Sequence, residues 1–233
     1  MSHWKTAGLV LFAASSVLGA GGSAHAQCNP FDTLCATEWT NGKIINLEAL
    51  PGFLGSEALG INNAGQAVGV SALGGFNAAT EWSNGSVMNL GALSGYTNSV
   101  AYGINGPGQV VGLSFNRIAG GDYVHATEWS RGNVIDLGGL SGFTNSQANA
   151  INDSGQAVGY SQVGDNEIAT EWSDGKIINL GGLLSSSYAE GINNAGQVVG
   201  YSQVGDNEIA TAGDAVGFSL GNGPISCSSW HLI

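Results

Sequence analysis

The sequence predicts an all-β fold of repeated four-stranded antiparallel units, arranged like a β-propeller of about four blades plus a truncated fifth. Ala-Thr-Glu-Trp recurs at spacings of 43, 47 and 43 residues, each copy carries two hairpin signals, and 39 of 233 residues are glycine. A period near 43 residues is typical of a propeller blade and is too long for a β-helix rung. An open linear array of β units is the alternative, because four copies are few for ring closure.

The composition excludes several other classes of protein. With 43% hydrophobic residues and six tryptophans, the chain is too apolar for a disordered protein. Only five residues are basic against 17 acidic ones, and the formal net charge is −12. Because such a chain cannot form a basic patch, nucleic acid and anionic membrane surfaces are not expected partners.

Residues 1–26 are predicted to be a secretory signal peptide. Lys5 precedes a short apolar run, and Ala24-His25-Ala26 provides the small-x-small pattern of a cleavage site. The apolar run is shorter than the ~20 residues that cross a bilayer. We therefore expect export, with no membrane span after signal removal.

Residues 27–35 are expected to form an N-terminal segment that contains two of the three cysteines. In an oxidising compartment Cys28 and Cys35 could close a small disulfide loop, which leaves Cys227 over. Inert thiols are the other interpretation. Zinc is disfavoured, because only two histidines follow residue 26 and a structural site needs four converging ligands.

Four repeat copies are predicted within residues 36–211. Each begins with Ala-Thr-Glu-Trp, continues through a glycine turn and an Asn/Asp-Leu step, and closes on Ile-Asn-x-x-Gly-Gln-x-Val-Gly-x-Ser. Asn-Gly or Asp-Gly marks the first hairpin, because both residues tolerate positive φ, and a glycine-bearing turn marks the second. Each copy therefore contains four short strands. The copies span 36–78, 79–125, 126–168 and 169–209.

Strand alternation predicts which side chains are buried. The tryptophan of each copy is expected to dominate a core, and so is the aliphatic pair of the second strand, such as Ile45 and Leu47. In the last strand Val68 faces away from a row of small residues that lets a neighbour approach closely. The repeated glutamate lies opposite the tryptophan face and is expected on a solvated outer face. These glutamates are Glu38, Glu81, Glu128 and Glu171.

Three segments carry a family resemblance: His125-Ala126-Thr127-Glu128-Trp129, Asp136-Leu137-Gly138-Gly139-Leu140 and Ile192–Gly200. Through them the chain resembles the HAF repeat family of exported bacterial proteins, over nearly all of residues 36–202. The family's phenylalanine is threonine in every copy here, and its histidine occurs only at position 125. The resemblance implies an exported bacterial β-repeat protein with no defined reaction.

Residues 210–233 are predicted to be a truncated fifth repeat and an irregular C-terminus. Ser161–Thr170 recurs verbatim at Ser202–Thr211, but Glu-Trp does not follow the second time. Instead, residues 212–219 resemble the last strand of the first copy. We interpret this segment as a fifth copy that has lost its middle.

No catalytic, cofactor-binding or metal-ligating residue is predicted. Gly217–Gly221 has the spacing of a hydrolase nucleophile elbow, but no acid lies between Ser219 and His231. The loops Gly164–Glu167 and Gly205–Glu208 lack the spaced acidic series of a calcium loop. His125 has no evident partner in the sequence and is expected at the surface.

The sequence thus predicts a secreted bacterial protein, extracellular or periplasmic, without enzymatic activity. It would act as a structural or ligand-binding scaffold at or outside the cell envelope, with an extracellular glycan or a protein as partner. The alternative is a carbohydrate-binding or glycan-hydrolysing propeller. Hydrolysis needs two carboxylates some 5–9.5 Å apart across a cleft, and one acid per copy on an outer face does not provide that pair.

Overall fold

The computed structural model describes residues 34–117, 122–183, 185–204 and 207–214, and every regular element in these ranges is a β-strand. The all-β prediction is confirmed. The predicted signal peptide, Cys28, Cys227 and the Gly217–Gly221 motif lie outside the described residues. Cys35 is disulfide-bonded, and its pairing with Cys28 stays a prediction. No helix of the length and hydropathy that a membrane span requires occurs in these ranges.

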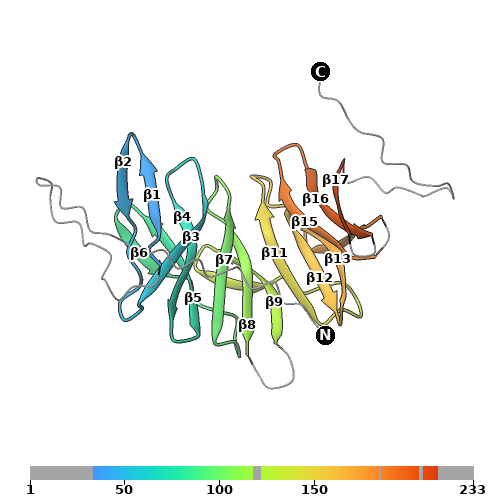
Figure 1. The fold of residues 1–233 in the computed structure, drawn as a ribbon, viewed down its shortest axis with the longest axis horizontal. Helices are drawn as coiled ribbons and strands as arrows, with labels where there is room; N and C mark the ends of the chain where they lie inside the picture. Colours follow the sequence, from blue (N-terminus) through green and yellow to red (C-terminus); the bar gives the residue numbers. More distant parts are fainter. Residues whose placement is uncertain (1–33, 118–121, 184, 205–206, 215–233) are drawn as a thin grey trace, which may run out of the picture.

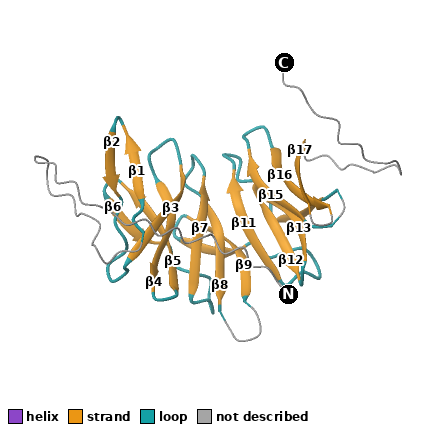
Figure 2. Cartoon of the chain, viewed as in Figure 1, coloured by secondary structure: helices purple, strands orange, loops and turns teal. Residues whose placement is uncertain are grey.

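The strands form five antiparallel sheets in chain order, which we name blades A to E (Figures 1 and 2). Blade A has two strands, blades B, C and D have four, and blade E has three. Blade A contains β1 (Thr37–Thr40) and β2 (Lys43–Asn46), and blade B contains β3 (Gly55–Ile61), β4 (Ala67–Leu73), β5 (Phe76–Ser83) and β6 (Ser86–Asn89).

The remaining blades repeat this arrangement. Blade C contains β7 (Asn98–Ile104), β8 (Val110–Asn116), β9 (Tyr123–Ser130) and β10 (Asn133–Asp136). Blade D contains β11 (Asn145–Ile151), β12 (Ala157–Val163), β13 (Asn166–Ser173) and β14 (Lys176–Gly181). Blade E contains β15 (Ser187–Ile192), β16 (Gln197–Val204) and β17 (Asn207–Asp214).

Each four-stranded sheet combines the end of one sequence copy with the start of the next. In blade B, β3 and β4 carry the closing motif of the first copy, whereas β5 carries the Ala-Thr-Glu-Trp of the second. The two halves join through a tight turn at Gly74-Gly75, so the copy boundary is itself a hairpin. The sheets are therefore offset by half a unit from the sequence copies, and blade A is a half-blade.

The predicted turn chemistry is confirmed at the outer hairpin of the blades. Asn84 and Gly85 have φ values of 51° and 73°, the left-handed pair that a two-residue type I′ turn requires. Blade C uses Arg131-Gly132 with the same geometry, although arginine is not a usual residue for it. The tight turn fixes the register that pairs Trp82 with Val87.

The hydrophobic core lies between consecutive blades. Trp129 of blade C groups with Val68 and Ala79 of blade B, and Trp172 of blade D groups with Val111 and Ala126 of blade C. Trp82, Trp129 and Trp172 are each no more than 4% exposed, which confirms the prediction for three of the four tryptophans. It is wrong for Trp39, which is 75% exposed.

The prediction that both aliphatic residues of the second strand are buried is wrong for one residue of each pair in blades B, C and D. In these pairs only the leucine packs against a core cluster (Leu90, Leu137 and Leu180). The residue two positions earlier is exposed in each case, namely Met88, Ile135 and Ile178. These strands form an edge of their sheets, and in each pair only the leucine that follows reaches the core between blades.

The blades stand side by side in an open arc, with blades A and E at its two ends (Figure 1). The first strand of a blade packs across the preceding blade, as β7 does on β3, β4 and β5. Within the described residues the sheets do not close into a ring. The architecture is propeller-like in its blades and open in its arrangement.

Candidate ligand-binding cleft

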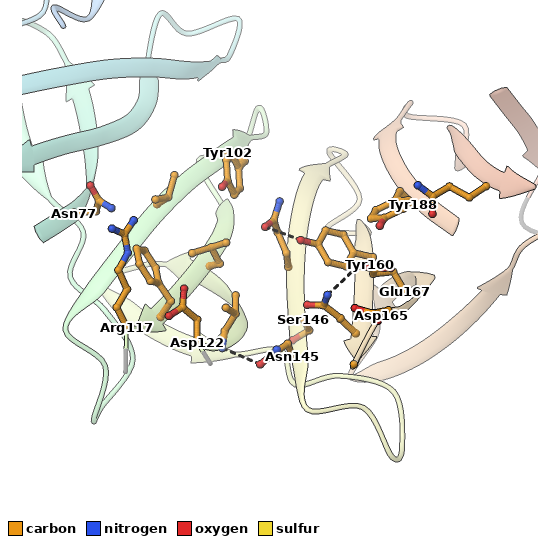
Figure 3. Close-up of a pocket in the computed structure, with 18 of the residues that line it drawn as sticks. Asn77, Tyr102, Arg117, Asp122, Asn145, Ser146, Tyr160, Asp165, Glu167 and Tyr188 are labelled. Carbon is orange, nitrogen blue, oxygen red and sulfur yellow. Dashed lines mark hydrogen bonds between the residues drawn. The ribbon is translucent and has the colours of Figure 1, made fainter. Parts of the chain in front are cut away.

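A cleft of about 740 Å³ with mixed polar and aromatic walls lies along blades C, D and E and also includes Asn77 of blade B (Figure 3). Its aromatic wall comes from tyrosines on the first two strands of these blades. They are Tyr102 on β7, Tyr160 on β12, Tyr188 on β15 and Tyr201 on β16. Strand pairing within blade E brings Tyr188 and Tyr201 together, and the stacking of successive blades adds Tyr160 and Tyr102.

Three of the tyrosines form a continuous aromatic cluster. The rings of Tyr188 and Tyr201 are stacked with centroids 4.6 Å apart, and the ring of Tyr160 meets Tyr188 edge-on at 5.1 Å. Tyr188 and Tyr201 are cross-strand partners in blade E, whereas Tyr160 comes from blade D. The cluster therefore spans the junction of two blades and gives the cleft an aromatic wall.

Glu167 is the best-positioned acid in the cleft. Its Oε1 accepts a hydrogen bond of 2.8 Å from Gln162 Nε2, and its Oε2 accepts one of 3.0 Å from Ser186 Oγ. With these two donors, one on each oxygen, the carboxylate is held in place as a fixed acceptor.

Burial and nearby acids keep the cleft tyrosines protonated. Desolvation raises the pKa of Tyr188, and the Glu167 carboxylate raises it further. Desolvation likewise raises the pKa of Tyr160, whose hydroxyl donates a hydrogen bond of 3.1 Å to Gln147 Oε1. At neutral pH these side chains therefore present uncharged phenols.

The charged groups on the cleft wall are mostly acidic. Asp122, Asp165 and Glu167 line it together with one base, Arg117, whose guanidinium lies 5.4 Å from the centroid of the Phe115 ring. Such a lining disfavours anionic ligands. The cleft instead suits an uncharged polar or a cationic ligand that also has an apolar face.

No histidine or cysteine is among the described residues that line the cleft. Ser146 is the buried hydroxyl there, and its Oγ accepts a hydrogen bond of 3.0 Å from the Ala126 amide. That bond gives Ser146 a structural role between blades C and D. No group of three His, Cys, Asp or Glu side chains with metal-binding geometry occurs in the described part of the chain.

The repeated glutamates do not lie on a solvated outer face, which corrects the sequence prediction. Glu171 is only 3% exposed, and Glu81 and Glu128 are partly buried. Each accepts a hydrogen bond of 2.9–3.0 Å from the glutamine of the Gly-Gln motif in its own blade. The reason is that strands 2 and 3 of a blade pair so that the glutamine side chain reaches across to the glutamate.

The same glutamine links each glutamate to the next blade through an asparagine. Asn105 Nδ2 donates to Gln109 Oε1 at 2.9 Å and to the Asn152 carbonyl of the following blade at 2.9 Å. The pattern recurs from Asn62 to Asn105 and from Asn152 to Asn193. The acid, the amide and the asparagine thus form a buried polar connection between blades.

His125 lies apart from this cleft chemistry and has a partner, contrary to the prediction. Its Nδ1 is 2.9 Å from Asp136 Oδ2, and its ring is 5.4 Å from that of Tyr96. The histidine is on β9 and the aspartate on β10, so one hairpin brings them together. Of the two predicted acidic loops, Gly164–Glu167 borders the cleft, and Gly205–Glu208 lies largely outside the described residues.

The cleft tyrosines were not predicted from the sequence, although the repeats contain a signal for them. Position x of Val-Gly-x-Ser is Val70, Leu113, Tyr160 and Tyr201 in successive copies, within an otherwise fixed motif. Its cross-strand partners are Glu57, Val100, Gln147 and Tyr188. Variation at facing positions beside a repeated motif indicates side chains that the repeat itself does not fix.

Comparison with known proteins supports the fold. No protein-family description and no curated protein sequence matches the chain. Among solved structures it is similar to TolB from Acinetobacter baumannii, a β-propeller protein, with a TM-score of 0.50 and 13% sequence identity. The match covers 74% of this chain and 44% of the TolB chain, so the chain spans less than half of that protein. At this identity the likeness concerns the fold alone, and the chain is an all-β, propeller-like repeat protein.

Proposed function

We propose that this chain is a non-enzymatic binding scaffold, exported from a bacterial cell, that holds an uncharged carbohydrate in its tyrosine cleft. The single observation that carries the proposal is the Tyr160–Tyr188–Tyr201 cluster, which faces a polar lining of amides and carboxylates. Sugar rings combine a flat C–H face with many hydroxyls. An aromatic wall beside fixed hydrogen-bond acceptors matches both parts of such a ligand.

The hydrogen bonds that hold Glu167 in the cleft favour binding over catalysis. Glu167 accepts hydrogen bonds from Gln162 and Ser186, as a fixed acceptor for ligand hydroxyls would. Proton transfer in glycan hydrolysis requires an acid and a base that can exchange protons with the substrate, and a carboxylate already bonded through both oxygens is poorly suited to that role. We therefore place glycan hydrolysis second.

Export and membership of the HAF repeat family are part of the proposal. They are supported by the signal-like residues 1–26, the disulfide at Cys35, and the motif repeated from Ile61–Ser71 onward. A disulfide is typical of proteins that fold in an oxidising compartment. Expression in a bacterial host, followed by N-terminal sequencing of the secreted protein, tests this part. We expect the mature protein to begin at Gln27.

A glycan array, followed by calorimetry with the best-bound oligosaccharide, tests the binding function. Tyr188→Ala removes the central ring of the cluster and is expected to weaken binding about tenfold or more, which corresponds to ~1.4 kcal/mol. Tyr123→Ala is the matched control, because Tyr123 is exposed on β9 and does not line the cleft. Binding of no glycan, or an equal effect of the two variants, would contradict the proposal.

The same preparations separate binding from hydrolysis. Incubation of the bound oligosaccharide with the protein should release no new reducing ends. If reducing ends appear and Glu167→Gln abolishes them, the second candidate, a glycan hydrolase, replaces the scaffold.

A further inference from the structure

The two ends of the arc expose side chains that the blades between them bury. Trp39 of blade A is 75% exposed, whereas its counterparts in blades B, C and D are at most 4% exposed. Val199 of blade E is 51% exposed, whereas its counterparts Val68, Val111 and Val158 are fully buried. Both differences arise at positions that carry the same residue in every copy.

These positions define two distinct faces on every blade. The tryptophan face carries the tryptophan of the third strand and the branched residue paired with it, such as Trp129 and Val134. The valine face carries the valine that follows the Gly-Gln motif, such as Val68. Inside the arc, the tryptophan face of each blade packs on the valine face of the blade before it, as Trp129 does with Val68 and Ala79.

Within the described residues, blade A leaves its tryptophan face open. Trp39 and Ile44 are cross-strand partners, and each is 75% exposed. On the opposite side of the same hairpin, Ala36 is buried against Ala67 and Trp82 of blade B. Ile61, on the side of blade B that faces blade A, is 58% exposed where its counterpart Ile104 is 9% exposed, so the half-blade A leaves that side partly uncovered.

We propose that a second copy of this chain covers this surface, with the valine face of its blade E seated on the tryptophan face of blade A. The occupant is argued from the chain itself, because the arc already contains the matching interface between its own blades. Both complementary halves are present on one molecule, one at each end. An unrelated partner would have to reproduce a fit that a second copy already has.

The contact is heterologous, because the two surfaces that meet are different. Head-to-tail contacts of this kind close into a ring when the rotation permits and otherwise extend into longer assemblies. Each chain therefore keeps one free end after the first contact. This property distinguishes the proposal from a symmetric dimer in which two tryptophan faces meet.

Sedimentation velocity over a range of protein concentrations tests the proposal on the purified full chain. We expect concentration-dependent self-association, and we expect W39S and V199D each to remain monomeric at concentrations where the unaltered chain associates. I135S is the matched control, because Ile135 is also an exposed large apolar side chain, at 41%, but belongs to the middle blade C and so lies at neither end of the arc. Circular dichroism verifies that each variant keeps the β-fold.

Mixing the two variants is the decisive measurement. W39S retains its valine face and V199D retains its tryptophan face, so an equimolar mixture should form one-to-one dimers and nothing larger. Self-association of V199D alone would indicate a tryptophan-to-tryptophan contact and overturn the proposal. The proposal would also be overturned by a chain that stays monomeric at every concentration and whose Trp39 is shielded from fluorescence quenchers by another segment of the same molecule.

Discussion

The middle blades and the end blades are built from the same repeat, yet they differ in how much of it they bury. Trp129 and Trp39 occupy equivalent strand positions, but the first lies between two blades and the second has no blade before it within the described residues. A repeat of this kind cannot bury its own apolar faces, so its stability depends on its neighbours. The tryptophan is therefore an interface residue between blades as much as a core residue of its own copy.

Removing equivalent tryptophans from a middle blade and from an end blade should give the largest difference in stability. Trp129→Ala deletes a buried side chain between blades B and C and should lower the free energy of unfolding by about 3–5 kcal/mol. Trp39→Ala deletes an exposed one and should change it by no more than ~0.5 kcal/mol. Urea unfolding at low protein concentration measures both. Equal losses would mean that Trp39 is covered in solution.

Glycine substitutions separate strain inside a blade from packing between blades. A Cβ at Gly112 would collide with the Val100 carbonyl of the paired strand, and one at Gly200 would collide with the Tyr188 carbonyl. Because both collisions occur within a blade, Gly112→Ala and Gly200→Ala should each cost roughly 3 kcal/mol, at the end of the arc as in its middle.

Gly139→Ala is the control for these glycines. A Cβ there would meet its nearest neighbours at 3.5 Å, an ordinary contact distance, and Gly139 has no positive φ. Thermal unfolding of the three variants should place Gly139→Ala close to the unaltered chain. A Gly200→Ala variant as stable as Gly139→Ala would show that blade E does not form the tight pairing of the middle blades.

The elements of the fold follow from local sequence, but their grouping does not. Asn84-Gly85 and the apolar alternation around it predict the outer hairpins, because turn geometry and strand period are local properties. The offset of half a blade was not predictable in this way. The turn at Gly74-Gly75 joins two copies as tightly as Asn84-Gly85 joins two strands of one copy, so nothing local marks the sheet boundary.

The cleft was harder to predict from the sequence than the fold. Tyr160 and Tyr188 belong to different copies and meet only because blades D and E stack, so no spacing along the chain announces their contact. His125 and Asp136 were within reach of prediction, since they lie on the two strands of one hairpin. Contacts inside a hairpin can be worked out from register, whereas contacts between blades require the arrangement of the sheets.

A smaller effect tests the polar connection between blades. Asn105 is 3% exposed and bonds both to Gln109 and to the next blade, so Asn105→Ala should cost about 1–3 kcal/mol by leaving buried groups without partners. Asn193 in blade E bonds to Gln197 but is exposed, and Asn193→Ala should cost ~0.5 kcal/mol. Chemical denaturation measures the unfolding free energy of both variants. A larger loss of stability for Asn193→Ala than for Asn105→Ala would contradict the expectation that the middle blades depend more on this connection than the end blade.

The smallest expected effect concerns alkaline pH at the junction of blades D and E. Desolvation raises the pKa of Tyr160 and Tyr188 above the ordinary value of 10.0, so folding favours their protonated forms. When the folded pKa is the higher one, the stabilising contribution is complete below pH 10 and is lost as the pH rises further. Unfolding free energies measured between pH 8 and 11 should therefore fall above pH 10, and Tyr188→Phe should flatten that fall. A fall of unchanged steepness in Tyr188→Phe would mean that Tyr188 titrates as freely in the folded chain as in the unfolded one.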